Sequence, residues 1–282
     1  MRFTTKMKVV WLGTVAFVVL MTVGITYGMQ DPAMHPPAAA SSDRSSDAPP
    51  PPPTSAPASP SPSPSASSPD DGKHQDDPSK IKSDNPLDRV IYTTGSNAVA
   101  LTFDDGPDPN WTPKVLGKLR EYGVKATFCL VGKNADAYPE LVQEIVRDGH
   151  TLCNHSWSHD LELGKKSREE IRKDMQKTND AIHRAVPGED IAYFRHPGGN
   201  WTNNAIDIAS ELGMKSLNWN VDPKDWEKPS AKKIADRVIT NTKVGSIVLL
   251  HDAGGDRTNS YNALDRILKE LGDRFKLIPL RH

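Results

Sequence analysis

The sequence predicts an α/β domain from about Leu87 to His282, built either as a parallel β/α barrel or as an open doubly wound sheet. Seven short apolar runs alternate with helix-like segments over this range. Polar residues cluster directly after several of these runs, which is where both folds place their chemistry. Most of the 24 prolines of the chain fall before residue 90, and this change of composition marks a domain boundary.

The first 29 residues contain an apolar run, Val9 to Met29, that follows three basic residues. At about 1.5 Å per helical residue, this run can cross the roughly 30 Å hydrocarbon core of a bilayer. The basic flank favours a cytoplasmic N-terminus, with the bulk of the chain outside the membrane. We therefore expect residues 1–29 to be a membrane anchor. The alternative is a signal segment cleaved near residues 38–40, which would make the protein secreted. Either interpretation makes the domain extracytoplasmic.

Residues 30–86 are rich in Pro, Ser, Ala and Asp, and include the run PPPPPTSAPASPSPSPSASSP. Their few apolar side chains cannot offset the entropy of ordering, so we expect a disordered linker. At about 3 Å per extended residue it would reach on the order of 100 Å from a membrane. The net charge of −1 provides no basic field for nucleic acid, and we expect a monomer.

The elements of the domain follow from the alternation of its segments. The expected strands are residues 98–103, 126–131, 150–154, 191–195, 214–220, 246–252 and 275–280. The expected helices lie near residues 112–122, 138–148 and 167–186, and after Asn203, Ser230 and Asn259. Cys129 and Cys153 lie in the second and third expected strands. They are either a disulfide, which an exported domain tolerates, or two small buried hydrophobic residues.

Two polar clusters indicate a metal site. His155 and His159, in CNHSWSHD, are four residues apart, so their rings can meet on one face of a turn and bind zinc or a similar ion. Asp104 and Asp105, in LTFDDGPDP, follow the first expected strand, although an acidic surface turn would have the same sequence pattern. One aspartate would complete a three-ligand catalytic site, while the other would stay free to accept a proton. The residues alone do not decide the order of the two roles.

Five motifs, TFDDGP, HSWSH, FRHPGGNW, DPKDW and IVLLHDAG, occur in the order and approximate spacing of the polysaccharide deacetylase (NodB-like) family, of the carbohydrate esterase family 4 type. The chain resembles this family over residues 97–280. The resemblance implies a distorted (β/α)7 barrel and a single catalytic domain over residues 87–282. It also implies that Asp104 is the general base and that the ligands of a divalent metal are Asp105, His155 and His159. Zinc is expected first, with cobalt or manganese as alternatives.

Further roles are implied in the same way. Arg195 would hold the base, His251 would be the general acid, and Asp225 would tune that acid. Leu249 and Trp226 match family residues that line a pocket for the acetyl methyl group, although both could equally be core residues.

The third motif departs from the common Arg-Pro-Pro-Tyr-Gly pattern of the family. His196 replaces the first proline and Gly198 replaces the aromatic residue. A glycine keeps the backbone N–H that the family aims at the oxyanion, but it widens the wall of the subsite. Among the tryptophans, we expect Trp157 and Trp201 to contact glycan.

The resemblance predicts a metal-dependent hydrolase that removes N-acetyl groups from an amino-sugar polymer. Peptidoglycan is favoured because the domain is expected outside a membrane, and chitooligosaccharide is the second substrate considered. One alternative is an O-acetyl esterase acting on acetylxylan, since both reactions pass through an oxyanion. Another is a catalytically silent cell-wall-binding module. The presence of two aspartates and three histidines in the motifs argues against this module, because a binder does not need them together.

Overall fold

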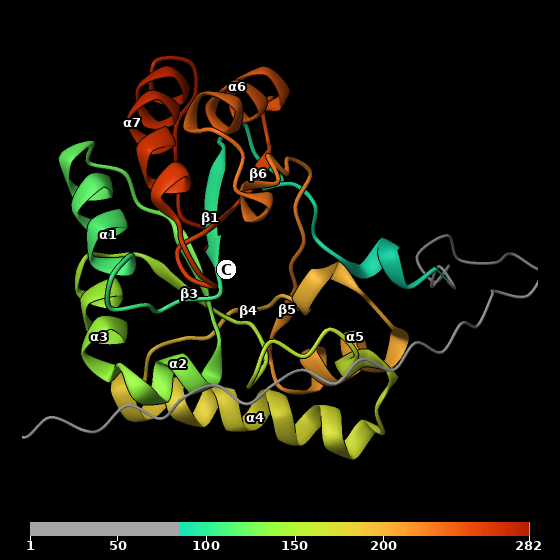
Figure 1. The fold of residues 1–282 in the computed structure, drawn as a ribbon. Helices are drawn as coiled ribbons and strands as arrows, with labels where there is room; N and C mark the ends of the chain where they lie inside the picture. Colours follow the sequence, from blue (N-terminus) through green and yellow to red (C-terminus); the bar gives the residue numbers. More distant parts are fainter. Residues whose placement is uncertain (1–84, 282) are drawn as a thin grey trace, which may run out of the picture. The chain divides into compact units, whose positions relative to one another are not determined.

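Six parallel strands in the order β5-β4-β3-β2-β1-β6 form the sheet in a computed structural model that describes residues 85–281 (Figure 1). The strands are β1 (Ala100–Asp104), β2 (Thr127–Leu130), β3 (Thr151–Asn154), β4 (Tyr193–Phe194), β5 (Lys215–Ser216) and β6 (Ile247–His251). The expected anchor and nearly all of the expected linker lie outside the described residues. Within residues 85–281, no helix combines the length and the apolar character needed to cross a bilayer.

Seven α-helices occur in the described part of the chain: α1 (Thr112–Glu121), α2 (Gly132–Ala137), α3 (Pro139–Arg147), α4 (Arg168–Ala185), α5 (Asn203–Glu211), α6 (Ala231–Asn241) and α7 (Thr258–Gly272). The longest, α4, begins with a capping box in which Ser167 and Glu170 satisfy each other's backbone N–H groups. Thr202 and Ser230 are the N-cap residues of α5 and α6, and each hydroxyl oxygen accepts a hydrogen bond from a backbone N–H of the first turn. The short helix α2 was not expected from the sequence.

The helices form a chain of neighbours around the outside of the sheet. Contacts run from α6 to α7, from α7 to α1, from α1 to α3, from α3 to α4 and from α4 to α5. This ring covers one face of a curled parallel sheet, as in a β/α barrel (Figure 1). The barrel class expected from the sequence is therefore confirmed.

Single bridges, not a seventh strand, link the edges of the described sheet. The bridges pair Ile91 with Leu217, Thr93 with Ser246, and Val221 with Val248. The expected seventh strand, residues 275–280, contributes one bridge, between Leu277 and Val99, so that expectation is corrected. Pro279 has no N–H to continue the ladder. The next N–H, that of Leu280, donates to the side chain of Thr127 on β2 instead.

Alternation along the strands separates two buried clusters. On β1, Leu101 and Phe103 join the large core beneath the helices, whereas Ala100 joins a smaller cluster inside the barrel. Cys129 and Cys153 face each other in register on β2 and β3, and the structure joins them in a disulfide within this inner cluster. Of the two alternatives that the sequence left open for these cysteines, the structure shows the disulfide.

The parallel strands bring their carboxyl ends to one edge of the sheet. Asp104 ends β1, Asn154 ends β3 and His251 ends β6. Asp104 and His251 are also register partners on adjacent strands. Residues that are almost 150 positions apart in the chain are thereby placed side by side without any contribution from the loops.

Candidate active site

A cavity of about 380 Å³ opens at the carboxyl ends of the strands. Its lining residues are Asp104, Asp105, His155, His159, Leu161, Gly198, Trp219, Asp222, Trp226, Leu249 and His251. The structure thus gathers in one cavity the base, ligands, acid and acetyl-pocket residues that the sequence predicted. Leu161, Trp219 and Asp222 were not predicted.

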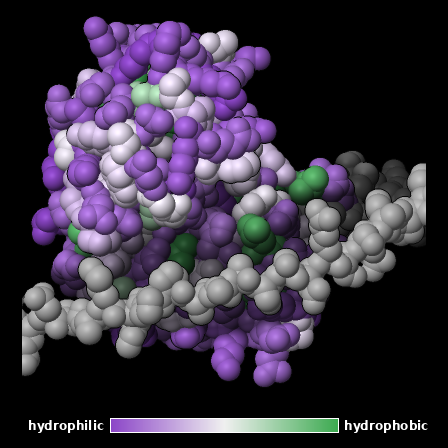
Figure 2. Space-filling view, viewed as in Figure 1, coloured by the Kyte–Doolittle hydropathy of each residue, from purple (hydrophilic) through white to green (hydrophobic). Residues whose placement is uncertain are grey.

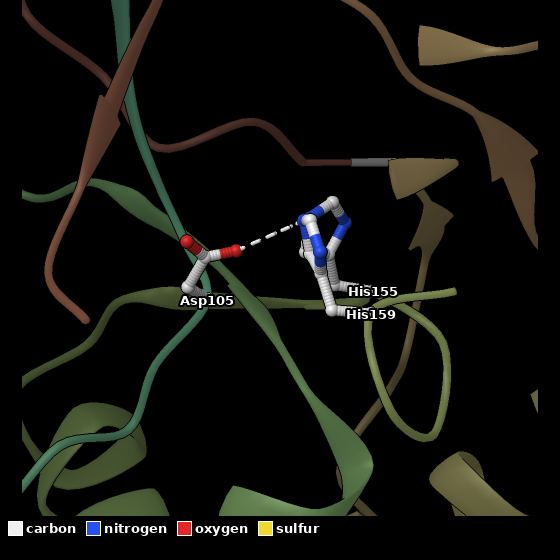
Figure 3. A group of neighbouring side chains, drawn as sticks. All are labelled: Asp105, His155 and His159. Atoms are coloured by element: carbon white, nitrogen blue, oxygen red, sulfur yellow. Dashed lines mark ion pairs between the residues drawn. The ribbon is translucent and has the colours of Figure 1, made fainter. Parts of the chain in front are cut away.

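Asp105, His155 and His159 converge in the cavity (Figure 3). The Oδ1 atom of Asp105 lies 3.6 Å from Nε2 of His155 and 3.3 Å from Nε2 of His159. Ligand atoms that each lie about 2.1 Å from a tetrahedral ion are about 3.4 Å apart. The spacing of these three side chains therefore fits a divalent cation.

The protonation of His155 supports the same conclusion. Its Nδ1 lies 2.8 Å from the carbonyl oxygen of Arg195, which can only accept, so Nδ1 carries the proton and Nε2 carries a lone pair. Burial lowers the pKa of His155 against the opposing effect of Asp104 and Asp105, so the ring is neutral. The lone pair faces a carboxylate oxygen of each aspartate at 3.6 Å. Asp105 Oδ1 is itself buried without a hydrogen-bond partner. Lone pairs that face one another with no proton between them are suited to bind a cation.

The backbone is unusual at the same positions. Five described non-glycine residues have positive φ: Asp105, Ser156, His159, Lys224 and Lys228. Two of them are predicted metal ligands, and the two lysines flank the short 3₁₀ turn Asp225–Glu227. Non-glycine residues adopt this conformation at an energetic cost, and such residues concentrate at functional sites.

Asp104 is buried and paired with Arg195. Nη1 of Arg195 donates to Oδ1 of Asp104 at 2.6 Å and to the Thr102 hydroxyl at 2.9 Å, while Nη2 donates to the carbonyl of Asn218. Burial alone would raise the pKa of Asp104, but the charge and hydrogen bond of Arg195, together with the charge of His251, overcome it and lower that pKa. The carboxylate is therefore ionised, with its second oxygen beside the three-ligand group.

His251, on the strand next to that of Asp104, is held by Asp225. Its Nδ1 lies 2.7 Å from Asp225 Oδ1, and its backbone N–H donates to Asp225 Oδ2. The hydroxyl of Ser260 also donates to that second oxygen. Burial would lower the pKa of His251, but the hydrogen bond and charge of Asp225 raise it to about 9. The ring is a cation at neutral pH, and its Nε2 remains free of Asp225.

Two charged residues after β6 belong to the surroundings of the site and were missed from the sequence. Arg257 is buried, and its Nη2 lies 3.9 Å from Asp105 Oδ2. A β-carbon on Gly254 would lie 2.6 Å from that same oxygen, so only glycine leaves room there. Asp252 is fully buried and accepts a hydrogen bond from Thr112. The charges in HDAGGDR, directly after a strand end, were the signal that could have identified both.

The other residues that the sequence analysis singled out for the substrate site do not all lie in the active cavity. Gly198 lines the cavity, but Trp201 lines a neighbouring hollow. Trp157 lies apart from both, under the ammonium group of Lys177, which is 3.7 Å from its ring centre. His196 is buried and forms hydrogen bonds with Gly164 and Pro197.

Comparison with known proteins relates this site to characterised ones. A family model described as polysaccharide deacetylase matches residues 92–217. A chitooligosaccharide deacetylase of Sinorhizobium fredii is 35% identical over 67% of this chain and 94% of its own length. A peptidoglycan-N-acetylglucosamine deacetylase of Bacillus cereus is 40% identical over 64% of this chain and 66% of its own length.

Solved structures show the same relationship. The Bc1960 peptidoglycan N-acetylglucosamine deacetylase, in complex with an N-hydroxybenzamide compound, superposes with a TM-score of 0.65 and 35% identity. The match covers 68% of this chain and 91% of the other. A carbohydrate esterase family 4 pseudoenzyme of Bacillus anthracis has a TM-score of 0.63 and 28% identity, covering 68% and 67% of the two chains. Both active and inactive proteins therefore share this fold.

Proposed function

Since this chain belongs to the polysaccharide deacetylase family, we propose that it hydrolyses N-acetyl groups on an amino-sugar polymer, with peptidoglycan as the first substrate and chitooligosaccharide as the second. The relatives that carry these substrates in their names support the proposal. The observation that carries it is the pairing of Asp104 with His251. An ionised carboxylate and a cationic imidazole occupy register positions on adjacent strands, beside a three-ligand group.

The three-ligand group fits the metal dependence that we propose. Asp105, His155 and His159 would hold a divalent cation, which supplies Lewis-acid polarisation of the acetyl carbonyl when bound, with zinc proposed first and cobalt or manganese as alternatives. Arg257, near the second oxygen of Asp105, would fix the orientation of that carboxylate.

Asp104 is the proposed general base. It accepts a proton from the attacking water as the water oxygen adds to the acetyl carbon. Arg195 donates to one oxygen of Asp104 and leaves the other directed at the site. The low pKa keeps Asp104 ionised, so the reaction does not have to wait for its deprotonation.

His251 is the proposed general acid. When the carbon–nitrogen bond breaks, the electron pair goes to nitrogen, and His251 supplies the proton that makes this nitrogen a neutral amine. Acetate and the free amino sugar are the products. Because Asp225 occupies Nδ1, the proton is delivered from Nε2. An amine is a poorer leaving group than an alcohol, so an acid that is protonated at neutral pH favours amide hydrolysis over the alternative ester hydrolysis.

The acetyl group would occupy the apolar part of the cavity. Leu249 and Trp226 line this cavity together with the backbone of Gly198. We assign the N–H of Gly198 to the carbonyl oxygen, where negative charge develops as water adds. Leu249 and Trp226 would then contact the methyl group and exclude water from it.

The test of this function is acetate release by the purified protein from peptidoglycan, chitooligosaccharides and acetylxylan. We expect acetate from the first two and little from the third. A chelator should abolish release, and comparing zinc, cobalt and manganese in the restored protein identifies the metal. Acetate from acetylxylan alone would make the protein an esterase. No acetate from any substrate would favour the silent binding module.

We also propose that residues 1–29 anchor the domain outside a membrane, on the basis of the apolar run and its basic flank. Cell fractionation with an antibody against the domain tests this. The domain should sediment with membranes. Recovery only from the medium, with a new N-terminus near residue 40, would instead establish secretion.

A further inference from the structure

The disulfide between Cys129 and Cys153 lies beside the proposed general base. One register row crosses the sheet from His251 on β6 through Asp104 on β1 to Cys129 on β2 and Cys153 on β3. Register partners in a parallel sheet direct their side chains to the same face. The disulfide therefore follows Asp104 along the inner face of the sheet, close to the edge where the active cavity opens.

The two cysteines also lie on strands that set the spacing of the proposed metal ligands. Asp105 directly follows β1, and His155 directly follows β3. The strand β2 carries none of the three ligands, but it lies between β1 and β3 in the sheet. The distance from Asp105 to the histidines is therefore set across β2. The disulfide makes one of the two strand contacts across this distance covalent.

Hydrogen bonds connect the end of β2 to both ligand-bearing segments. The side chain of Asn134, shortly after β2, donates to the carbonyl oxygen of Asp105 at 2.8 Å. On the other side, the N–H of His155 donates to the carbonyl oxygen of Leu130, the last residue of β2, at 2.9 Å. A displacement of β2 relative to its neighbours would therefore change the positions of Asp105 and His155 relative to each other.

Breaking the disulfide should cause such a displacement. A disulfide holds its sulfur atoms about 2 Å apart, whereas non-bonded heavy atoms stay roughly 3.5–4.0 Å apart. Both cysteines are 0% exposed within the inner cluster, and protein interiors have few voids that could take up the difference. The extra space must come from movement of the cysteine side chains and their strands. A metal site tolerates changes of only about 0.2 Å in its ligand distances.

We propose that the Cys129–Cys153 disulfide positions the metal ligands, so that the oxidised protein binds a divalent cation more tightly than the reduced protein. This role rests on the proposed function, because the metal site belongs to that activity. The cysteines act through Asp105 and His155. A dithiol reverses the effect by transferring two electrons and two protons to the sulfurs, which become two thiols, while the dithiol becomes a disulfide. The extracytoplasmic location proposed above favours the oxidised form.

The first test compares zinc binding by the full-length wild type and the double variant Cys129→Ala/Cys153→Ala. Competition with a chromophoric chelator measures Kd without turnover. The Kd of the double variant should be about 10–100 times higher, which is the usual effect of removing a group that supports metal ligands. Leu280→Ala is the matched control, because it changes the same inner cluster away from the ligands. Urea unfolding should show both variants less stable than the wild type, but only the double variant should bind zinc more weakly.

The second test reduces the wild type itself, which keeps the proposal testable if the double variant does not fold. The face of the domain in Figure 2 is mainly hydrophilic, and both sulfurs lie beneath the surface, so thiols are counted by alkylation and mass spectrometry after treatment with dithiothreitol. The reductant binds zinc, so it is removed without air before zinc is added. Reduced wild type should bind zinc as weakly as the double variant, and reoxidation should restore the affinity. The same treatment should leave the double variant unchanged.

The outcomes separate this role from the proposed function. If the double variant or the reduced wild type binds zinc as tightly as the oxidised protein, the disulfide only stabilises the fold and the proposal is wrong. Redox-dependent zinc binding without acetate release from any glycan would overturn the proposed function and leave the role of the disulfide standing. A wild type that binds no divalent cation would overturn this role, and acetate release in the presence of a chelator would then show that the hydrolysis stands without it.

Discussion

The two ends of the parallel sheet bury different kinds of residue. At the carboxyl end, Asp104, His155, Arg195 and Asp225 are each at most 2% exposed. At the amino end, Ala100 and Ile247, the first residues of β1 and β6, pair in register within the apolar inner cluster. Burying a charge is unfavourable unless it is paired. The charged groups at the carboxyl end therefore depend on their ion-pair and hydrogen-bond partners, while the amino end depends on apolar burial.

The floor of the barrel at the amino end is completed by the C-terminal segment. Leu280 is 5% exposed within the inner cluster, and its N–H donates to the Thr127 hydroxyl. The hydroxyl of Tyr193 donates to the Arg281 carbonyl. None of these contacts involves a residue of the active cavity. One sheet can thus separate stability from chemistry along its strands, as β/α barrels commonly do.

The largest expected effect tests the division of roles at the carboxyl end. Asp104→Asn should lower acetate release by about 10²–10⁴-fold and retain bound metal, because it removes the proton acceptor and leaves the three ligands in place. Asp105→Asn should lose the metal. Metal analysis beside the rate of acetate release distinguishes the two, with circular dichroism as the control for folding. The reverse pattern would exchange their roles.

A substitution at the amino end of the barrel should lower stability and leave activity unchanged. Leu280→Ala removes a buried side chain and should lower the free energy of unfolding by about 2–4 kcal/mol. At a temperature where the variant is folded, kcat should equal that of the wild type. Urea unfolding and acetate release measure the two quantities. A large fall in kcat without loss of stability would show that the two ends are coupled.

The pH dependence of the reaction should report the protonation state of the general acid at the carboxyl end. His251 acts as an acid only when protonated, so activity should fall as the pH rises through its pKa, about 9 in the protein without metal. Asp225→Asn removes the charge that raises this pKa, and should move the alkaline limb down by about 1–3 pH units. Profiles of kcat/KM for the variant and the wild type measure the shift. An unmoved alkaline limb would exclude His251 as the titrating acid.

The smallest effect concerns a charge that the proposed mechanism does not use. Burial raises the pKa of Asp252 from 3.8 to about 7, despite its hydrogen bond from Thr112. Between these values the folded state holds a proton that the unfolded state has released. Stability therefore falls as pH rises, with a slope of up to about 1.4 kcal/mol per pH unit.

Asp252→Asn should remove this contribution and become more stable than the wild type above pH 7. Urea unfolding of both proteins at pH 5–8, with a chelator present, checks it. Parallel curves for the two proteins at every pH would show that Asp252 does not titrate in this range.

Much of the candidate site could be predicted because its residues directly end predicted strands. Asp104 and His251 need only parallel strands to meet, since the ends of such strands lie at one edge. The apolar runs and the local spacing of His155 and His159 carry this information within short windows. Resemblance to a family then supplied the separate roles of Asp104 and Asp105, which the residues alone left open.

The rest depended on contacts between residues distant in the sequence. Pro279 ends the expected seventh strand after one bridge, and Trp157 meets Lys177 instead of the cavity. Arg257 reaches Asp105, and Leu161 fills the space beside Gly198, only because separate loops fold over the same strand ends. Local patterns in the sequence were enough to predict an alternating α/β domain and the chemical types at the carboxyl ends of its strands, because periodicity and strand ends are local, whereas the choice of a barrel came from the family resemblance. Only the tertiary structure decided which side chains surround them, because the path of each loop is set by packing against the others.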